Sequence, residues 1–226
     1  IEENKKRNLE QRAKISLVNS ITPFIDRMIH EVNRLSEGGE SDEVRRERYQ
    51  YIAELTDKIN QYNNVLTEWI QMRQGSLSLS IESFPLQGLF DIVAKGKMSF
   101  QMQGVTLEVE PTDAVVKADR ILTLFMINTI ADNARKFTPE GGKVTISAKV
   151  SDFVEISISD TGKGMDEDQL EHVFDRTYTG GHGFGLLNCK GIIEKYKKVS
   201  SLFAGCQIKA ESKLGEGSRF SFRLPK

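Results

Sequence analysis

Apolar residues recur at alternating three- and four-residue steps along the first third of the chain. From about Glu3 to Leu35 the sequence contains no glycine, and its apolar positions form one stripe along a predicted helix. A glycine-containing loop over residues 36–42 follows, and a second helical pattern runs from about Glu43 to Arg73. Gly75 would end this second helix. Two long helices joined by a short loop predict an antiparallel hairpin.

A single hairpin would leave the apolar stripe of its first helix exposed to water. The members of this stripe are Ile15, Val18, Ile21, Ile25, Met28, Val32 and Leu35. Pairing with a second copy of the chain would bury the stripe in a four-helix bundle, and we favour this homodimer. The alternative is that the hairpin packs against the C-terminal part of its own chain.

After Gly75 the rhythm changes to short alternating or β-branched runs separated by helical patterns. Strands are predicted at Leu79–Phe84, Gly104–Val109, Val144–Val150, Val154–Asp160, Cys206–Glu211 and Ser218–Leu224. Helices are predicted near Leu86–Met102, Arg120–Lys136, Glu167–Phe174 and Phe184–Tyr196. Interspersed strands and helices indicate an α+β sandwich, in which helices cover a mixed sheet. The predicted fold class is therefore multidomain, with an α-helical hairpin over residues 1–75 and an α/β sandwich over residues 76–226.

Composition adds few constraints to this picture. The 226 residues carry 31 basic and 32 acidic side chains, and the net charge of −1 gives no general attraction to nucleic acid or to an anionic membrane. No apolar run approaches the roughly 18 residues that cross a bilayer, and the charged start has no signal-peptide pattern. Cys189 and Cys206 lack metal-ligand spacing, which fits a reducing cytoplasm. Because the chain begins inside a helical pattern, we expect it to be a piece of a longer protein.

The first candidate for chemistry lies near the end of the helix predicted over Arg120–Lys136. Here the chain reads Asn-Thr-Ile-Ala-Asp-Asn-Ala-Arg-Lys-Phe-Thr-Pro, beginning at Asn128. Asp132, Asn133 and Lys136 fall within one helical turn, so that acid, amide and ammonium can reach one site. An amide oxygen is a hard ligand that suits Mg²⁺, and a neighbouring lysine can meet phosphate. Taken alone, such a pattern is more often a solvated polar helix end.

The second candidate is the turn that follows the alternating strand ending at Asp160, where the chain continues Thr-Gly-Lys-Gly-Met. A partly buried aspartate accepts hydrogen bonds well and can read the exocyclic amine of adenine. Gly162 and Gly164 allow the backbone to turn tightly and to approach a flat base. Taken alone, this pattern also fits a plain turn after a strand.

The third candidate is the glycine-rich run Gly-Gly-His-Gly-Phe-Gly-Leu over residues 180–186, which opens a predicted helix. A loop of this kind aims backbone N–H groups at an anion, and the helix dipole adds to the attraction. The spacing differs from the GxxxxGK[ST] pattern of a Walker loop, and the position in the chain differs from that of a Rossmann fingerprint.

Together, the three patterns resemble the N-box and the two glycine boxes of the GHKL ATPases in both order and spacing. The run Val173–Arg176 resembles the F-box of histidine kinases, and Gly215–Pro225 resembles their closing β-hairpin. The resemblance covers Leu79–Lys226 and, with the helical hairpin before it, nearly the whole chain. The chain thus resembles the catalytic core of a two-component sensor histidine kinase.

This resemblance implies ATP and Mg²⁺ as cofactors and assigns a role to each candidate residue. Asn133 would coordinate Mg²⁺, and Lys136 would contact phosphate. Asp160 would bind the adenine amine, with Gly162 and Gly164 shaping its pocket. Phosphoryl transfer needs mainly positioning and charge neutralisation, which these residue types provide. The loop residues that would hold the ATP phosphates are Gly181, His182, Gly183, Gly185 and Leu186.

Two features depart from the family pattern. Thr129 occupies the position, four residues before Asn133, at which the family often has Asn or Glu. Asp132 could then orient the reactants or accept the proton in its place. The segment between Phe174 and Gly181, where the family has its mobile ATP lid, is unusually short.

A histidine kinase also needs a nucleophilic imidazole on the first helix of its hairpin. His30 is the candidate by location, and Glu31 beside it could orient the ring. The surrounding residues resemble the family's H-box, except that Leu35 stands where a proline is usual. In a rival register the Thr-Pro pair ending at Pro23 matches the end of the H-box, and Val18 then occupies the acceptor position. Both registers stay open; in the second, the protein has no acceptor and His30 is a solvated helix residue.

The sequence therefore predicts a cytoplasmic, homodimeric, ATP-dependent protein-histidine kinase. It would phosphorylate a histidine within the helical hairpin of residues 1–75. It would then pass the phosphoryl group to an aspartate on the receiver domain of a response regulator. A membrane-anchored parent protein would carry a sensor region before residue 1. A second hypothesis, favoured by Val18, Thr129 and the short lid, is a degenerate kinase scaffold that binds nucleotide without phosphotransfer. A topoisomerase or mismatch-repair fragment is disfavoured, because those proteins place no such hairpin directly before this domain.

Overall fold

The computed structural model describes residues 21–73, 79–174 and 184–226. The chain divides into two compact units, Ile1–Ser78 and Leu79–Lys226. Within the described ranges, none of the helices combines the length and the apolar character needed to cross a bilayer.

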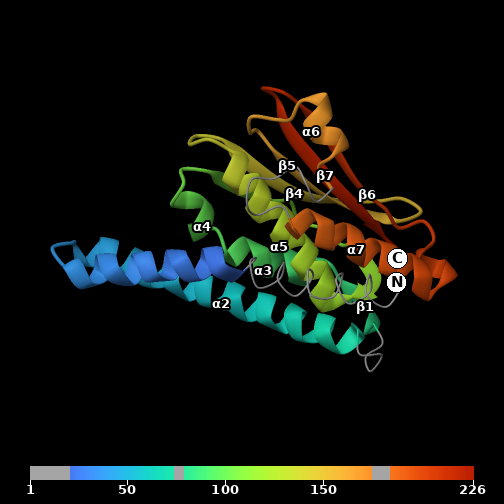
Figure 1. Cartoon of the computed structure of the whole chain (residues 1–226), viewed down its shortest axis with the longest axis horizontal. Helices are drawn as coiled ribbons and strands as arrows, with labels where there is room; N and C mark the ends of the chain where they lie inside the picture. The colour runs from blue at the N-terminus through green and yellow to red at the C-terminus, as the bar shows by residue number, and fades with distance from the viewer. Residues whose placement is uncertain (1–20, 74–78, 175–183) are drawn as a thin grey trace, which may run out of the picture. The chain divides into compact units, whose positions relative to one another are not determined.

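The described part of the first unit consists of two helices (Figure 1). One covers residues 21–37, and α2 spans Asp42–Arg73. Phe24, near the described start of the first helix, packs against Tyr62 in the second half of α2, with ring centroids 5.2 Å apart. Because an early residue of one helix meets a late residue of the next, the two helices run antiparallel over these residues. The remainder of the predicted hairpin, before residue 21, lies outside the described residues and stays a prediction.

A largely buried ion cluster ties these two helices together near their connecting loop. The Arg48 guanidinium of α2 donates to the Glu31 carboxylate and, through Nε, to Glu40 at 2.7 Å. The Glu31 and Arg48 side chains are only 7% and 12% exposed. Hydrogen bonds to Glu40 and Glu31 raise the pKa of Arg48, and the hydrogen bond from Arg48 lowers the pKa of Glu40. Arg48 therefore stays charged while it neutralises two carboxylates.

The second unit is built on a five-stranded mixed sheet in the order β2-β4-β5-β7-β6. The β2 and β4 strands pair in parallel, and the other neighbours pair antiparallel. The strands are β2 (Thr106–Val109), β4 (Lys143–Val150), β5 (Val154–Asp160), β6 (Ile208–Lys213) and β7 (Gly217–Leu224). A second, two-stranded sheet pairs β1 (Ile81–Pro85) with β3 (Val115–Asp119) in antiparallel register.

Helices cover one face of the five-stranded sheet. In Figure 1, α5 and α7 lie on the same side of the sheet, and α5 packs on both β4 and β5. Val154, Ile156 and Ile158 of β5 are fully buried, because alternate strand residues point to the same face. The helical elements are α3 (Gln87–Lys95), α4 (Met98–Gln101), α5 (Arg120–Phe137), α6 (Glu167–Glu171), α7 (Phe184–Val199) and the short 3₁₀ turn η1 (Ser201–Phe203).

A buried hydroxyl holds the end of α7 to the start of α5. Asp119 caps α5 by accepting from the N–H groups of Ile121 and Leu122, and its own N–H donates to the Tyr196 hydroxyl at 2.9 Å. The Tyr196 ring stacks on Phe203 with centroids 4.9 Å apart, and burial raises the pKa of Tyr196. The neutral hydroxyl therefore fixes where α7 lies along α5.

The predicted mixed sheet covered by helices is confirmed, although the strand predicted near Leu79–Phe84 (β1) lies in the separate two-stranded sheet. Two further details of the prediction were wrong. Val115–Asp119, where no strand is predicted from the sequence, forms β3 with Val116 and Ala118 fully buried. The helix expected near Leu86–Met102 is two helices, because the chain turns at Gly96. Neither difference alters the strands that carry the candidate residues.

Replacing Arg48 with methionine should destabilise the helical unit by about 1–2 kcal/mol, because the Glu31 carboxylate loses its counter-charge in a cluster that solvent partly screens. The free energy of opening, measured by native-state hydrogen exchange of α2 amides, should fall by that amount. Arg45→Met is the matched control: Arg45 pairs with Asp42, whose side chain is 98% exposed, so its loss should cost about 0.5 kcal/mol or less. Equal effects of the two substitutions would contradict the buried role of Arg48.

Candidate functional site

The carboxylate of Asp160, at the end of β5, anchors the tight turn that follows it. Its Oδ1 accepts from the Gly162 N–H at 2.8 Å and from the Ser218 N–H of β7 at 3.2 Å. Burial raises the pKa of Asp160, and the two backbone N–H bonds oppose that shift. Since both of these donors bond to Oδ1, Oδ2 is the oxygen that can serve a ligand. Asp160 is thus a nearly buried acceptor with one oxygen committed to the fold.

The turn between β6 and β7 braces the turn after Asp160 from outside. Gly164 has a φ of +65°, and a Cβ there would lie 2.0 Å from the Lys213 carbonyl oxygen. The Met165 N–H donates to the Ser212 hydroxyl at 2.9 Å, and the Gly215 N–H donates to the Lys163 carbonyl at 2.7 Å. This close backbone approach explains why glycine is needed at position 164.

The end of α5 meets the same turn. A Cβ added to Gly162 would lie 2.5 Å from the Phe137 carbonyl oxygen, and the Lys163 N–H donates to that oxygen at 3.4 Å. Phe137 is the last residue of α5 and directly follows Lys136. The helix end that carries the amide and the lysine is therefore joined by backbone contact to the glycine turn that follows Asp160.

The start of α7 lies against the preceding turns of α5. A Cβ added to Gly185 would lie 2.7 Å from the Thr129 methyl and 4.0 Å from the Asn133 side-chain nitrogen. Thr129 is buried, while Asn133 is partly exposed. The small residue at position 129 and the glycine at position 185 thus allow the N-terminus of α7 to approach the amide of Asn133.

Contacts along α5 link the three sequence patterns: Gly185 at the start of α7 lies beside Asn133, and Gly162 lies beside both the Asp160 carboxylate and the Phe137 carbonyl at the end of α5. Gly164 belongs to the same turn as Gly162. Lys136 belongs to the same helix end, and its side chain is exposed; Leu186 follows Gly185 in α7 and is half-buried. The other predicted phosphate-loop residues, Gly181, His182 and Gly183, lie outside the described residues.

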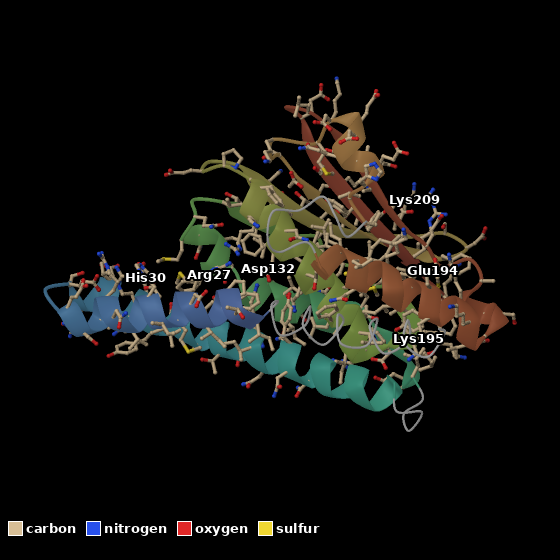
Figure 2. The ribbon with its side chains drawn as sticks, in the orientation of Figure 1. Arg27, His30, Asp132, Glu194, Lys195 and Lys209 are labelled. Carbon is tan, nitrogen blue, oxygen red and sulfur yellow. The ribbon has the colours of Figure 1, made fainter. Side chains whose placement is uncertain are left out.

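Asp132 of α5 (Figure 2) is held by a neighbouring cation. Its Oδ1 lies 3.5 Å from Nε of Arg135, and the two side chains are 12% and 2% exposed. Arg135 also donates to Gln103 at 2.6 Å. The Asp132 carboxylate is therefore engaged by a buried arginine on its own helix.

The residues predicted for the phosphoacceptor site have contrasting surroundings. His30 is exposed on the helix of residues 21–37 (Figure 2). Its predicted helper Glu31 is buried, and its carboxylate is bound to Arg48. The rival acceptor position, Val18, lies outside the described residues. Glu31 therefore belongs to the ion cluster that it forms with Arg48 and Glu40.

The donor set at the site fits a magnesium ion that is carried in with phosphate. The described residues contain no cluster of three or more His, Cys, Asp or Glu side chains suited to hold a metal. Mg²⁺ commonly keeps several waters and takes substrate phosphate oxygens with only one or two protein ligands. The amide of Asn133, beside the α7 N-terminus, suits that mode of binding.

Sequence reasoning missed several residues that build the site. Ser218 supplies the second donor to Asp160, Ser212 binds the turn, and Phe137 supplies the carbonyl that meets Gly162. The pairing of Asp160 with Ser218 across β5 and β7 could have been inferred only from the strand register. The Gly-Glu-Gly-Ser run at the start of β7 was the available signal, because a glycine there permits close strand approach.

Residues 118–226 match the model of the histidine kinase-, DNA gyrase B-, and HSP90-like ATPase family. The chain is 30% identical over 203 residues to the sensor protein SrrB of Staphylococcus aureus (strain MRSA252), covering 83% of this chain and 33% of SrrB. It is 31% identical over 180 residues to the sensor protein DivL of Caulobacter vibrioides, covering 76% of this chain and 22% of DivL. The chain therefore spans a third or less of the length of these curated relatives.

The fold is similar to that of a solved histidine kinase domain. The catalytic domain of histidine kinase ThkA aligns with a TM-score of 0.54 and 25% identity, covering 65% of this chain and 97% of that domain. Family model, relatives and fold agree on one assignment. Residues 118–226 therefore form a domain of the histidine kinase-, DNA gyrase B-, and HSP90-like ATPase type, and the chain is related in sequence and fold to the sensor histidine kinases.

Proposed function

We propose that the chain is the catalytic core of a sensor histidine kinase. It binds ATP with Mg²⁺, transfers the γ-phosphoryl group to a histidine, and passes it to an aspartate on the receiver domain of a response regulator. The observation that supports this most directly is that α5 contacts both other motifs: Asn133 lies beside Gly185, and the Phe137 carbonyl lies beside Gly162 in the turn after Asp160. Three motifs separated in the sequence would have no reason to converge if each were an ordinary turn or helix end.

Adenine recognition is the role proposed for Asp160. Its Oδ1 is held by two backbone N–H groups, so Oδ2 is the acceptor for the exocyclic amine of adenine. Gly162 and Gly164 keep the turn narrow enough for a flat base to lie beside the carboxylate. A guanine base presents a carbonyl at the corresponding position and would place oxygen against oxygen. The site therefore favours adenine nucleotides.

Phosphate binding is the role proposed for the end of α5 and the start of α7. Lys136 and the N–H groups at the N-terminus of α7, near Gly185 and Leu186, provide positive charge and donors. By the family pattern, Gly181, His182 and Gly183 belong to the same phosphate loop. Bound Mg²⁺ would neutralise phosphate charge, and the Asn133 amide oxygen is the protein ligand proposed for it. Asp132, fixed by Arg135, orients the reacting groups beside this ligand.

The hairpin supports a homodimer. Ile25, Ile29 and Val32 follow one another at steps of four and three residues, and they are 43%, 53% and 46% exposed. Such a stripe on one helix face is what a second copy would cover in a four-helix bundle. In this proposal residues 1–75 dimerise and carry the acceptor, and residues 76–226 bind ATP. The working protein is cytoplasmic in this part, and its longer parent is anchored to a membrane.

His30 is the acceptor proposed within the described residues, because its exposed imidazole is open to a phosphoryl donor. On incubation with γ-³²P-ATP and Mg²⁺, the chain should incorporate label that is stable to alkali and labile to acid, as a phosphohistidine is. The label should disappear in His30→Gln, while ATP binding measured by calorimetry stays unchanged. Label that persists in His30→Gln would remove His30 as the acceptor, with His172→Gln as the control for labelling elsewhere.

A second candidate function is a nucleotide-binding scaffold without phosphotransfer. The observation that favours it is the engagement of Glu31 by Arg48, which takes away the carboxylate that was expected to orient His30. In the labelling experiment this candidate predicts ATP binding with no incorporation in the wild-type chain. The two functions are therefore separated by one measurement on the same protein.

Replacing Asp160 with asparagine should reverse the base preference of the site. The Asn oxygen would keep the two backbone N–H bonds, so its NH₂ group would face the base. Donor would then meet donor at adenine, and ATP affinity should fall by about 10²-fold. The same NH₂ group can donate to a guanine carbonyl, so GTP affinity should rise relative to ATP. Calorimetry with both nucleotides tests this, and an unchanged ATP-to-GTP ratio would refute the role given to Asp160.

A further inference from the structure

An exposed aromatic ring between two lysines lies at the junction of α5 and the turn after Asp160. Phe137 is 43% exposed. The Lys136 ammonium lies 5.2 Å from its ring centroid, and the Lys163 ammonium lies at the same distance. The two ammonium groups are therefore separated by no more than twice that distance. One comes from the helix that carries Asn133, and the other comes from the turn that follows Asp160.

The backbone of Lys163 is fixed from two sides. Its N–H donates to the Phe137 carbonyl, and its C=O accepts from the Gly215 N–H at 2.7 Å. The residue also lies between the closely packed Gly162 and Gly164. The flexible stem of Lys163 thus starts from a defined point, so less conformational entropy is lost when its ammonium group binds a ligand.

The charges around this ring are unbalanced. Among the ion pairs of the described residues, none joins Lys136 or Lys163 to a carboxylate. A ring face gives each ammonium some attraction, but it does not cancel the repulsion between two like charges. A polyanion placed between them would do so. The cluster therefore fits a ligand that carries several negative charges.

On the basis of the proposed nucleotide site, we propose that Lys163 is a second phosphate-binding cation that acts together with Lys136. The adenine-reading turn would then contribute to phosphate binding as well as to base recognition. The contribution of Lys163 to binding affinity would then increase with the number of phosphates on the nucleotide. It would be absent for adenosine, which carries no phosphate.

The experiment compares the wild-type chain, Lys163→Met and Lys163→Arg by calorimetry with ATP, ADP, AMP and adenosine. Methionine keeps an apolar stem against Phe137 and removes the charge. Lys163→Met should weaken ATP binding about fivefold, a size suited to an exposed charge pair, and should leave adenosine binding unchanged. Arginine should restore ATP binding. The matched control is Lys149→Met, which removes an exposed lysine at the far end of β4.

Salt dependence gives a second measurement. The fall of ATP affinity between low and high ionic strength should be shallower in Lys163→Met than in the wild type, because one screened attraction has been removed. If Lys163→Met matches Lys149→Met in both measurements, the role proposed for Lys163 is wrong, whereas the proposed nucleotide site is unaffected. An equal loss for ATP and adenosine would also overturn it, because Lys163 would then act on the turn or the base. If the wild-type chain binds no adenine nucleotide, the proposed function itself fails.

Discussion

The Asp160 carboxylate is the group on which the second unit's site depends. It is 9% exposed, and the same oxygen takes a donor from its own turn and a donor from β7. A nearly buried carboxylate without such donors would be costly to keep charged. The central strand, the neighbouring strand and the turn are therefore fixed relative to one another by a group whose other oxygen is proposed to bind the base. Because the two backbone N–H groups bond to Oδ1 of Asp160, Oδ2 is the oxygen proposed to recognise the base.

The same unit positions the elements proposed to bind phosphate by holding α7 against α5 at both ends. Tyr196 binds the backbone at Asp119, where α5 begins. Gly185 lies against Thr129 and near Asn133, further along α5. The two helices thus run antiparallel, and their register places the start of α7 beside the amide proposed to hold Mg²⁺. A rigid pair of helices makes the position of an N–H cluster definite, which phosphoryl transfer requires more than it requires reactive side chains.

The sequence predicted those parts of this structure that rest on local chemistry. Alternation marked β5 and β7, and the glycines at 162 and 164 marked a tight turn, because both signals act over a few residues. It missed β3, where an exposed Val115 precedes the buried Val116 so that apolar residues do not alternate with burial, and it merged α3 with α4 across Gly96. Ser218 and Phe137 were missed for a different reason: their contributions are a backbone N–H and a backbone carbonyl, which any residue type could supply. Strand register and helix packing decide such contacts, and a local pattern does not contain them.

The case of Glu31 shows how a local pattern can misassign a residue whose partner lies elsewhere in the chain. A glutamate directly after a histidine on a helix was read as a helper to the imidazole. The two side chains, however, leave the helix about 100° apart, and burial selects between them: His30 is exposed, whereas Glu31 meets Arg48 across the hairpin. Freeing Glu31 for catalysis would leave Arg48 with Glu40 alone and open the cluster near the loop. If His30 is the acceptor, the proton it releases must therefore go to another group.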